Sequence, residues 1–174
     1  ASDVYKRQGH QYFRYSGDDY TQVDEGFPRT IEDDWGGLHQ VDAAFILDGK
    51  TYLFGKDADN NVVYVRYSNN DYTEQDEGYP KSPNDNWWNL PFELVQQGTT
   101  FKKIDAVFNG YDGKTYLFSG NQFIYFDHQQ RWWSEPAALN TYWDSIPFNT
   151  VSAAFTGKDG KTYIFSGKEY LLSL

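Results

Sequence analysis

The sequence predicts an all-β protein built from repeated units, on three observations. Phe, Tyr and Trp together make up 20% of the 174 residues, and aromatic and β-branched residues favour strands. Apolar positions recur at spacing two, not three or four, in "KTYLFG", "VVYVRYS" and "KTYIFSG", which indicates strands rather than helices. Finally, several phrases occur more than once, which is typical of a repeat architecture.

The clearest repetition joins "DEGFPRTIEDDWGGL", from Asp24 to Leu38, with "DEGYPKSPNDNWWNLP", from Asp76 to Pro91, 52 positions later. The same offset, without a gap, superposes Tyr12 on Tyr64, Arg14 on Arg66, Tyr15 on Tyr67, Asp19 on Asp71, Tyr20 on Tyr72 and Trp35 on Trp87. We interpret the phrase as a turn that each unit makes at the same place, because Gly supplies backbone freedom and Pro then fixes φ.

Three copies of a second phrase each predict a β-hairpin. They are "DAAFILDGKTYLFG" from Asp42, "DAVFNGYDGKTYLFSG" from Asp105 and "SAAFTGKDGKTYIFSG" from Ser152. In each copy an Asp-Gly pair separates two apolar runs, and hairpin turns need residues that tolerate positive φ. We therefore expect strand, turn and strand in all three.

A third aromatic run follows each hairpin, and a more polar fourth segment follows where present. The fourth segment leads to a Pro and then to a short Asp- or Asn-rich stretch, suited to the first turn of a helix, that ends in Trp35, Trp87 or Trp143. One unit is thus four strands and a short helix. Four strands in a period of about 45 to 60 residues are typical of a β-propeller blade, in which the aromatics pack blade against blade.

The ordered combination of "DAAF", "GKTYLF", "YVRYS", "EGYPKSP" and Trp87-x-x-Leu90-Pro91 resembles the hemopexin-like repeat, from about Gly9 to Tyr170. The resemblance implies blades that are four-stranded antiparallel sheets with a short helix, four of which make a propeller in this family. The wording "DEGYP" with "GKTYLFSG" is most similar to bacterial members, including toxin-associated repeats. An extracellular or secreted location is also implied.

The repeat phrases divide the sequence into a non-repeat leader and one propeller domain. The leader, residues 1–8, fits no repeat position and resembles junction or tag sequence. The domain contains a partial blade at 9–38, whole blades at 41–91 and 104–148, and a partial blade at 151–174. These make about three blades, so we expect a fragment of a four-bladed propeller or an unusual three-blade closure. An open arc would expose strand edges and favour a homodimer.

Composition excludes several classes of function. The absence of Cys rules out a disulfide framework and a thiolate metal site, and the formal charge of −10 disfavours nucleic acid as a partner. No apolar run approaches the roughly 20 residues that span a bilayer, and we expect no signal peptide in this sequence.

The resemblance implies a cation site in the central channel, because the family's innermost strands run along it and can bind a cation through backbone carbonyls. Residue by residue, the candidates are Asp42, Ala44, Asp105, Val107, Ser152 and Ala154, and calcium is the candidate ion. Ser152 removes one carboxylate, so any site rests on carbonyls. Calcium takes six to eight oxygens, and an incomplete ring supplies fewer. The alternative is that Asp42 and Asp105 cap the strand starts.

We expect neither haem nor an enzyme. Vertebrate hemopexin holds haem with histidines, but His10, His39 and His128 occupy none of the motif positions with that role. The zinc, phosphate-loop and nucleophile motifs of enzymes are absent from the sequence. Adjacent acids at Asp18-Asp19, Asp24-Glu25 and Asp33-Asp34 could suggest glycoside hydrolysis, but several of them recur in the next unit, which indicates an architectural role.

The expected function is a non-catalytic binding module that docks a protein partner, as the resemblance implies. The first alternative is a carbohydrate-binding propeller that uses exposed Trp and Tyr, with Trp88 and Trp132 as the candidate ligand surface. In Trp87-Trp88 and Trp132-Trp133 one ring can face the core while its neighbour faces away. A glycoside-hydrolase-like enzyme is the remote alternative.

Overall fold

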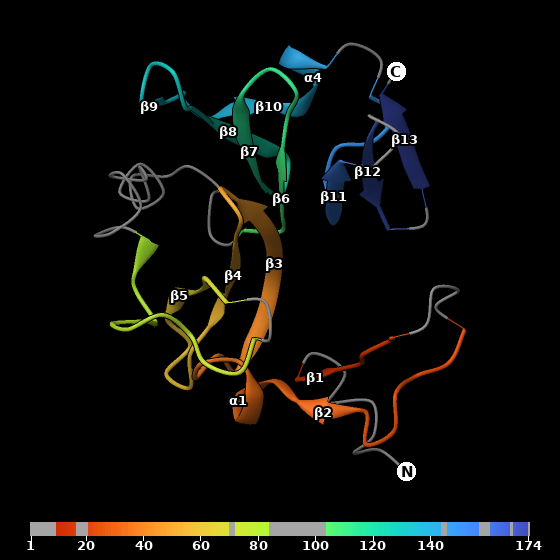
Figure 1. Ribbon diagram of the computed structural model, residues 1–174. Helices are drawn as coiled ribbons and strands as arrows, with labels where there is room; N and C mark the ends of the chain where they lie inside the picture. The colour runs from red at the N-terminus through yellow and green to blue at the C-terminus, as the bar shows by residue number, and fades with distance from the viewer. Residues whose placement is uncertain are drawn as a thin grey trace.

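The computed structural model describes residues 10–16, 21–69, 72–83, 104–143, 146–156, 161–167 and 169–173. They form antiparallel sheets with two short helices (Figure 1), which confirms the predicted all-β class. The leader, Trp87 and Trp88 lie outside these residues. The strands are β1 (Gln11–Tyr12), β2 (Arg29–Thr30), β3 (Gln40–Leu47), β4 (Lys50–Lys56), β5 (Val62–Tyr67), β6 (Ala106–Asn109), β7 (Lys114–Ser119), β8 (Gln122–Asp127), β9 (Trp132–Trp133), β10 (Ala137–Ala138), β11 (Ala153–Thr156), β12 (Thr162–Ser166) and β13 (Glu169–Ser173). The helices are α1 (Ile31–Asp34) and α4 (Leu139–Tyr142).

The three predicted hairpins are confirmed as β3–β4, β6–β7 and β11–β12, each followed by the predicted third strand. Asp48 and Gly49 have φ of +50° and +72° and Gly113 has φ of +76°, as the Asp-Gly turns require. The turn at 157–160 lies outside the described residues. The fourth strand is short: Lys81 forms one isolated bridge with Tyr64, and β10 pairs two residues with β8.

Each of the three hairpins carries three stacked aromatic rings on one face of its sheet, which we call the aromatic ladder. Register explains the ladder, because directly opposed residues on neighbouring antiparallel strands share a face. In β3–β4 the Phe45 ring is 5.3 Å from Tyr52 and 6.0 Å from Phe54. The other two ladders are Phe108 with Tyr116 and Phe118, and Phe155 with Tyr163 and Phe165.

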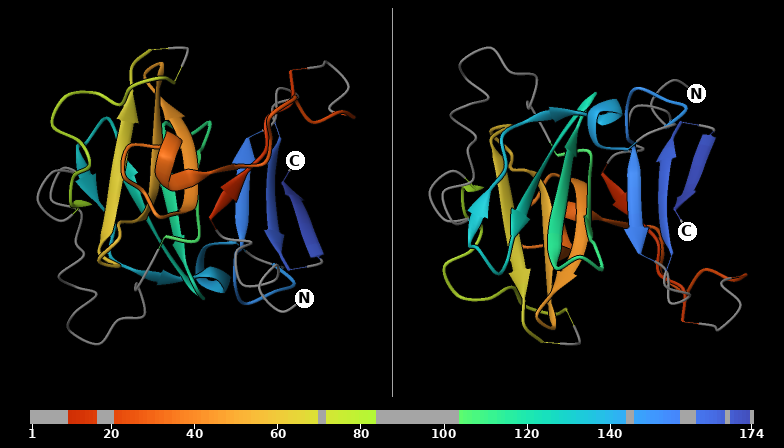
Figure 2. Two further views of the ribbon diagram at one scale, coloured as in Figure 1. Left: turned by 90° about the horizontal axis from the view of Figure 1, so that it is seen from below. Right: turned by 90° about the horizontal axis from the view of Figure 1, so that it is seen from above.

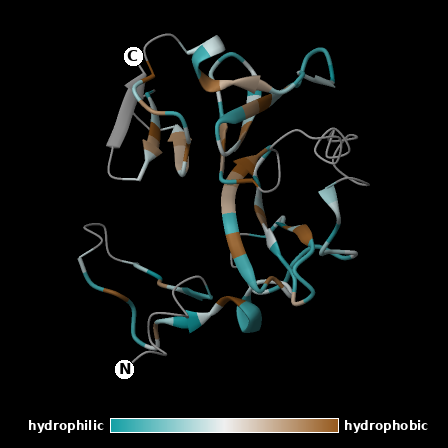
Figure 3. Ribbon diagram, turned by 180° about the vertical axis from the view of Figure 1, so that it is seen from behind, coloured by the Kyte–Doolittle hydropathy of each residue, from teal (hydrophilic) through white to brown (hydrophobic). Residues whose placement is uncertain are grey.

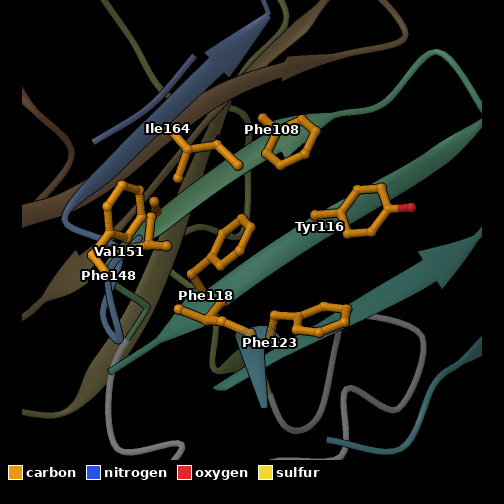
Figure 4. Close-up of a cluster of buried hydrophobic side chains, with 9 residues drawn as sticks. Phe108, Tyr116, Phe118, Phe123, Phe148, Val151 and Ile164 are labelled. Atoms are coloured by element: carbon orange, nitrogen blue, oxygen red, sulfur yellow. The ribbon is translucent and has the colours of Figure 1, made fainter. Parts of the chain in front are cut away.

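The opposite face of the β6–β8 sheet and that of the β11–β13 sheet carry aliphatic residues, and each packs on the ladder of the preceding unit. The Phe45 ladder packs against Val107, Leu117 and Ile124. Similarly, the Phe108 ladder packs against Val151 and Ile164 (Figure 4). Hydrophobic residues accordingly lie along the strands, and many turn residues are hydrophilic (Figure 3). The core is therefore a set of junctions between sheets, as the prediction of blade-to-blade packing requires.

The first strands of the three hairpins lie side by side. Strand β6 contacts β3 on one side and β11 on the other, and the three sheets follow one another around this group (Figures 1 and 2). Sheets β1–β2 and β11–β13 do not pair among the described strands. The described part of the chain therefore does not form the three-blade closure by strand pairing.

The repeated "DEG" phrase forms what we call the Arg–Asp clamp. Asp76 donates its backbone N–H to the Arg66 carbonyl at 2.8 Å, and its carboxylate accepts hydrogen bonds from Arg66 Nε and from Ser68. Asp24 makes the same contacts with Arg14 and Ser16. Two residues beyond each Asp, the glycines have φ of +85° and +81°, where only Gly is unstrained. The phrase recurs in both units because its Asp links the turn to the preceding strand by hydrogen bonds.

Replacing Asp76 with Asn tests the clamp through its pH dependence. Partial burial raises the pKa of Asp76, but hydrogen bonds from Ser68 and Arg66 outweigh it and hold the pKa below the usual 3.8. The stabilisation is therefore present above pH 3.8 and is lost as the pH falls through the lower folded-state pKa. Asp76→Asn should lower the free energy of unfolding at pH 7 by about 1–2 kcal/mol and flatten its decline in acid.

The measurement is chemical denaturation between pH 2.5 and 7, with the exposed neighbour substitution Glu77→Gln as the control. An Asp76→Asn profile that coincides with the wild-type profile at every pH would mean that the clamp does not stabilise the fold.

Candidate functional site

A groove lies where the β3, β6 and β11 strands approach their hairpin turns. Its volume is about 460 Å³, and Ala44, Val107 and Ala154 line it at equivalent positions of the three strands. Tyr72 and Thr51 form a further wall, and their hydroxyl oxygens are 3.3 Å apart. None of the described residues that line the groove has a charged side chain.

Side chains at one repeat position join the three strands beside this groove. Asn109 Nδ2 donates a hydrogen bond to the Ile46 carbonyl of the preceding unit. Thr156 Oγ1 donates at 2.8 Å to the carbonyl of Asn109. Two carbonyls of the inner strands are therefore already used in joining neighbouring units.

The predicted cation positions do not bring acidic side chains together. Asp105 Oδ2 accepts the backbone N–H of Gly120 at 2.7 Å, and Ser152 Oγ accepts that of Gly167 at 3.2 Å. Asp42 instead accepts from the Gln40 side chain, next to a register shift in β3. No group of three or more His, Asp or Glu side chains able to hold a metal occurs in the described part of the chain. The side chains of Asp105 and Ser152 thus serve the strand starts, and a cation would have to be held by carbonyls.

The three histidines lie in the scaffold. His10 Nδ1 is 2.6 Å from the His39 carbonyl oxygen, and His39 Nδ1 is 3.3 Å from Glu32. His128 Nε2 is 2.8 Å from Thr115 Oγ1. Each histidine thus contacts a neighbouring segment of the scaffold.

Of the adjacent carboxylates, Asp33 and Asp34 line a polar pocket of about 340 Å³ beside Trp35. Asp34 Oδ1 is 2.7 Å from the Arg29 guanidinium, and its Oδ2 accepts the Tyr12 hydroxyl at 3.0 Å. Both oxygens of Asp34 are therefore engaged with neighbouring side chains. A hydrolytic pair would need one carboxyl to donate a proton and the other to attack or to activate water.

Trp132 and Trp133 face opposite ways, as the alternation of neighbouring residues predicts. Trp132 is 45% exposed, whereas Trp133 packs on Phe126 with ring centres 5.0 Å apart. The Trp132 ring lies 5.7 Å from that of Tyr125, which lies 6.1 Å from Tyr142. Tyr142 is 47% exposed and belongs to α4. Trp132, Tyr125 and Tyr142 form a cluster that we call the aromatic surface.

The aromatic surface occurs where this unit departs from the other repeats. Tyr125 occupies the position of Arg14 and Arg66, and Ser134 that of Asp24 and Asp76. The backbone contact of the clamp remains, because Ser134 donates its N–H to the Tyr125 carbonyl at 2.9 Å. At the helix, Tyr142 stands where α1 has Asp34. Charged residues of the scaffold are thus replaced by rings, a signal that residue-by-residue alignment of the units reveals.

Polar groups border the aromatic surface. Lys114 Nζ lies 5.0 Å from the centre of the Tyr125 ring and 3.1 Å from Asp112 Oδ2. The Tyr116 hydroxyl donates to Asp112 Oδ2 at 2.7 Å and lies 3.3 Å from the Tyr142 hydroxyl. Partial burial raises the pKa of Asp112, but hydrogen bonds from Tyr116 and Lys114 outweigh it and hold that pKa below its usual value. Asp112 and Lys114 are therefore an ion pair at neutral pH, which we call the polar edge.

Comparison with known proteins identifies the fold. Residues 104–147 match the family model described as Hemopexin, whereas no curated protein matches the sequence. A hemopexin fold protein from cow pea is 18% identical, with a TM-score of 0.64 over 94% of this chain and 77% of that one. A Cicer arietinum lectin with two metal binding sites is 18% identical, with a TM-score of 0.61 over 95% of this chain and 81% of its own.

A third similar structure is a Cicer arietinum albumin showing hemagglutination. It is 20% identical, with a TM-score of 0.58 over 87% of this chain and 70% of that one. The matches agree with the repeat phrases, the hairpins and the junctions between sheets. They confirm the resemblance predicted from the sequence: residues 104–147 match as a hemopexin repeat, and the chain has the hemopexin fold.

Proposed function

We propose that the chain is a non-catalytic binding module and that its ligand is a carbohydrate, bound at the aromatic surface. The observation that carries the proposal is the replacement of a scaffold Arg and Asp by Tyr125 and Ser134 beside the exposed Trp132. Exposed rings offer apolar faces on which sugar rings stack, and their hydroxyls offer hydrogen bonds. The names of two similar structures, a lectin and a hemagglutinating albumin, support the same ligand class.

A non-catalytic role is supported by the state of the carboxylates. Asp24 and Asp76 are held in clamps and Asp34 is held by Arg29 and Tyr12. Hydrogen bonds from the clamp partners hold the pKa of Asp24 and of Asp76 below its usual value, which suits a structural acceptor better than a proton donor. Glycan recognition outside the cell also fits the extracellular location that the resemblance implies. No helix in the described residues is long and apolar enough to cross a membrane.

Trp132→Ala should remove carbohydrate binding. Stacking on the ring is the main apolar contact available at this surface, so the signal on a glycan array should fall at least about tenfold. The array should hold neutral and uronic-acid oligosaccharides from plants and bacteria. Trp132→Phe should retain part of the signal, because a smaller ring remains.

The matched control is Tyr111→Ala, which removes an aromatic side chain that is 71% exposed and lies in the hairpin turn. It should bind as the wild type does. Carbohydrate binding that survives Trp132→Ala unchanged, or a wild-type chain that binds no glycan on the array, would overturn the proposal.

A second candidate function is protein association, with a second copy of the chain as the partner. It is favoured by one observation: Phe155 is 49% exposed, whereas its equivalents Phe45 and Phe108 are 8% and 5% exposed. In those two units the next sheet covers the ladder. The Phe155 ladder is thus a face of the kind that this fold buries, and its pairing between two copies would form the homodimer expected from incomplete blade edges.

Light scattering with and without calcium tests this association. The wild type should form a concentration-dependent dimer, and Phe155→Ser should be a monomer because it places a hydroxyl at the centre of the face. Calcium should change the mass of neither the wild type nor the variant, since calcium takes six to eight oxygens and an incomplete ring of carbonyls supplies fewer. Tyr111→Ser is the control. A wild-type monomer at every concentration would contradict the dimer, and a calcium-dependent mass would support the predicted channel site.

A further inference from the structure

We propose that the polar edge, Asp112 and Lys114, selects neutral sugars over acidic ones at the aromatic surface. In the bound complex a sugar ring lies on Trp132 and Tyr125 while two of its neighbouring hydroxyls contact the ion pair. The inference rests on the carbohydrate-binding function proposed above and names the ligand class of the same site.

The geometry of the edge suits a pair of hydroxyls. Asp112 Oδ2 and Lys114 Nζ are 3.1 Å apart, so an acceptor and a donor stand side by side. A sugar hydroxyl both donates and accepts, and neighbouring hydroxyls on one ring can engage the carboxylate and the ammonium together. Both groups are accessible, since the side chain of Asp112 is 40% exposed and that of Lys114 is 22% exposed.

The edge is also continuous with the rings. Lys114 lies over the Tyr125 ring, and Tyr125 lies next to Trp132. On the other side, the Tyr116 hydroxyl joins Asp112 to the Tyr142 hydroxyl. Tyr116 is itself buried, so it holds the carboxylate in position without offering its own ring to a ligand. A ligand bound to the aromatic surface is therefore also next to the polar edge.

Charge sets the selectivity. The carboxylate and the ammonium neutralise each other, so the edge has no net charge with which to attract a uronic acid. The chain as a whole has a formal charge of −10, which repels anionic glycans. An acidic sugar would also place its carboxylate near that of Asp112. A neutral sugar is repelled neither by the net charge of the chain nor by the Asp112 carboxylate.

Another hairpin provides a matched control. Asp48, Gly49 and Lys50 repeat the sequence of Asp112, Gly113 and Lys114, but Arg66 occupies there the position of Tyr125. That hairpin therefore has the acid and the base without the neighbouring aromatic surface. If the edge acts only together with the rings, Asp48→Asn should leave binding unchanged.

The test compares Asp112→Asn, Asp48→Asn and the wild type on the array of neutral and uronic-acid oligosaccharides. Asparagine keeps the shape and an acceptor oxygen but leaves Lys114 as an uncompensated cation. Asp112→Asn should lower the neutral signal about tenfold and raise the ratio of acidic to neutral signal. Thermal melting of each variant checks that the fold is retained, and Lys114→Gln should shift the ratio in the opposite direction.

The outcomes separate this inference from the proposed function. A wild type that binds glycans through Trp132 but shows the same neutral-to-acidic ratio in Asp112→Asn and Asp48→Asn would overturn the inference alone. A wild-type preference for acidic glycans would do the same. A wild type that binds no glycan would overturn the proposed function and the inference together. If Asp112→Asn does not fold, Lys114→Gln provides the test: a lower ratio of acidic to neutral signal than in the wild type supports the inference, and an unchanged ratio overturns it.

Discussion

The packing of an aromatic ladder on the aliphatic face of the next sheet is the interaction on which this structure depends. A single sheet cannot bury its own hydrophobic faces, so each sheet must pack against another element. Phe54 and Phe118 are 1% and 0% exposed because the following unit covers them. Truncating such a ring to Ala costs about 3–5 kcal/mol in other proteins, a large share of the stability of a domain this size. Units that follow one another in the sequence therefore pack next to one another in the structure.

Residues that recur between units belong to the scaffold, whereas the residues of the candidate site are ones that differ between units. The Arg–Asp clamps and the ladders recur because every unit meets the same mechanical demand. In residues 104–148 the demand is met differently: Ser134 keeps the backbone contact of the clamp, while Tyr125 replaces its arginine. This frees the position from ion pairing and lets a ring join Trp132 at the surface. A fold that tolerates such a local exchange can acquire a ligand surface without changing its core.

Sequence predicted the features that local chemistry determines. The Asp-Gly turns of the first two hairpins, the alternating strands and the repeated "DEG" turn are confirmed, because each depends on residues close together in the chain. The opposite orientation of Trp132 and Trp133 followed from alternation for the same reason. The sequence did not predict the roles of Tyr125 and Tyr142. Tyr125 meets Trp132 through pairing of β8 with β9, and Tyr142 meets Tyr125 because α4 follows β10, which also pairs with β8. From the sequence, the role of Asp105 at the strand start is only an alternative to a cation site. Its hydrogen-bond partner, Gly120, is 15 residues away in the chain and comes near only when the hairpin forms.

The most direct test of this account restores the clamp in the unit that lost it. A chain carrying Tyr125→Arg and Ser134→Asp would have the residues of Arg66 and Asp76 at the aromatic surface, and its binding to the glycan array would be measured. We expect the variant to fold with a melting temperature at or above that of the wild type and to bind no glycan. Wild-type glycan binding by this variant would contradict the claim that the departure from the repeat creates the site.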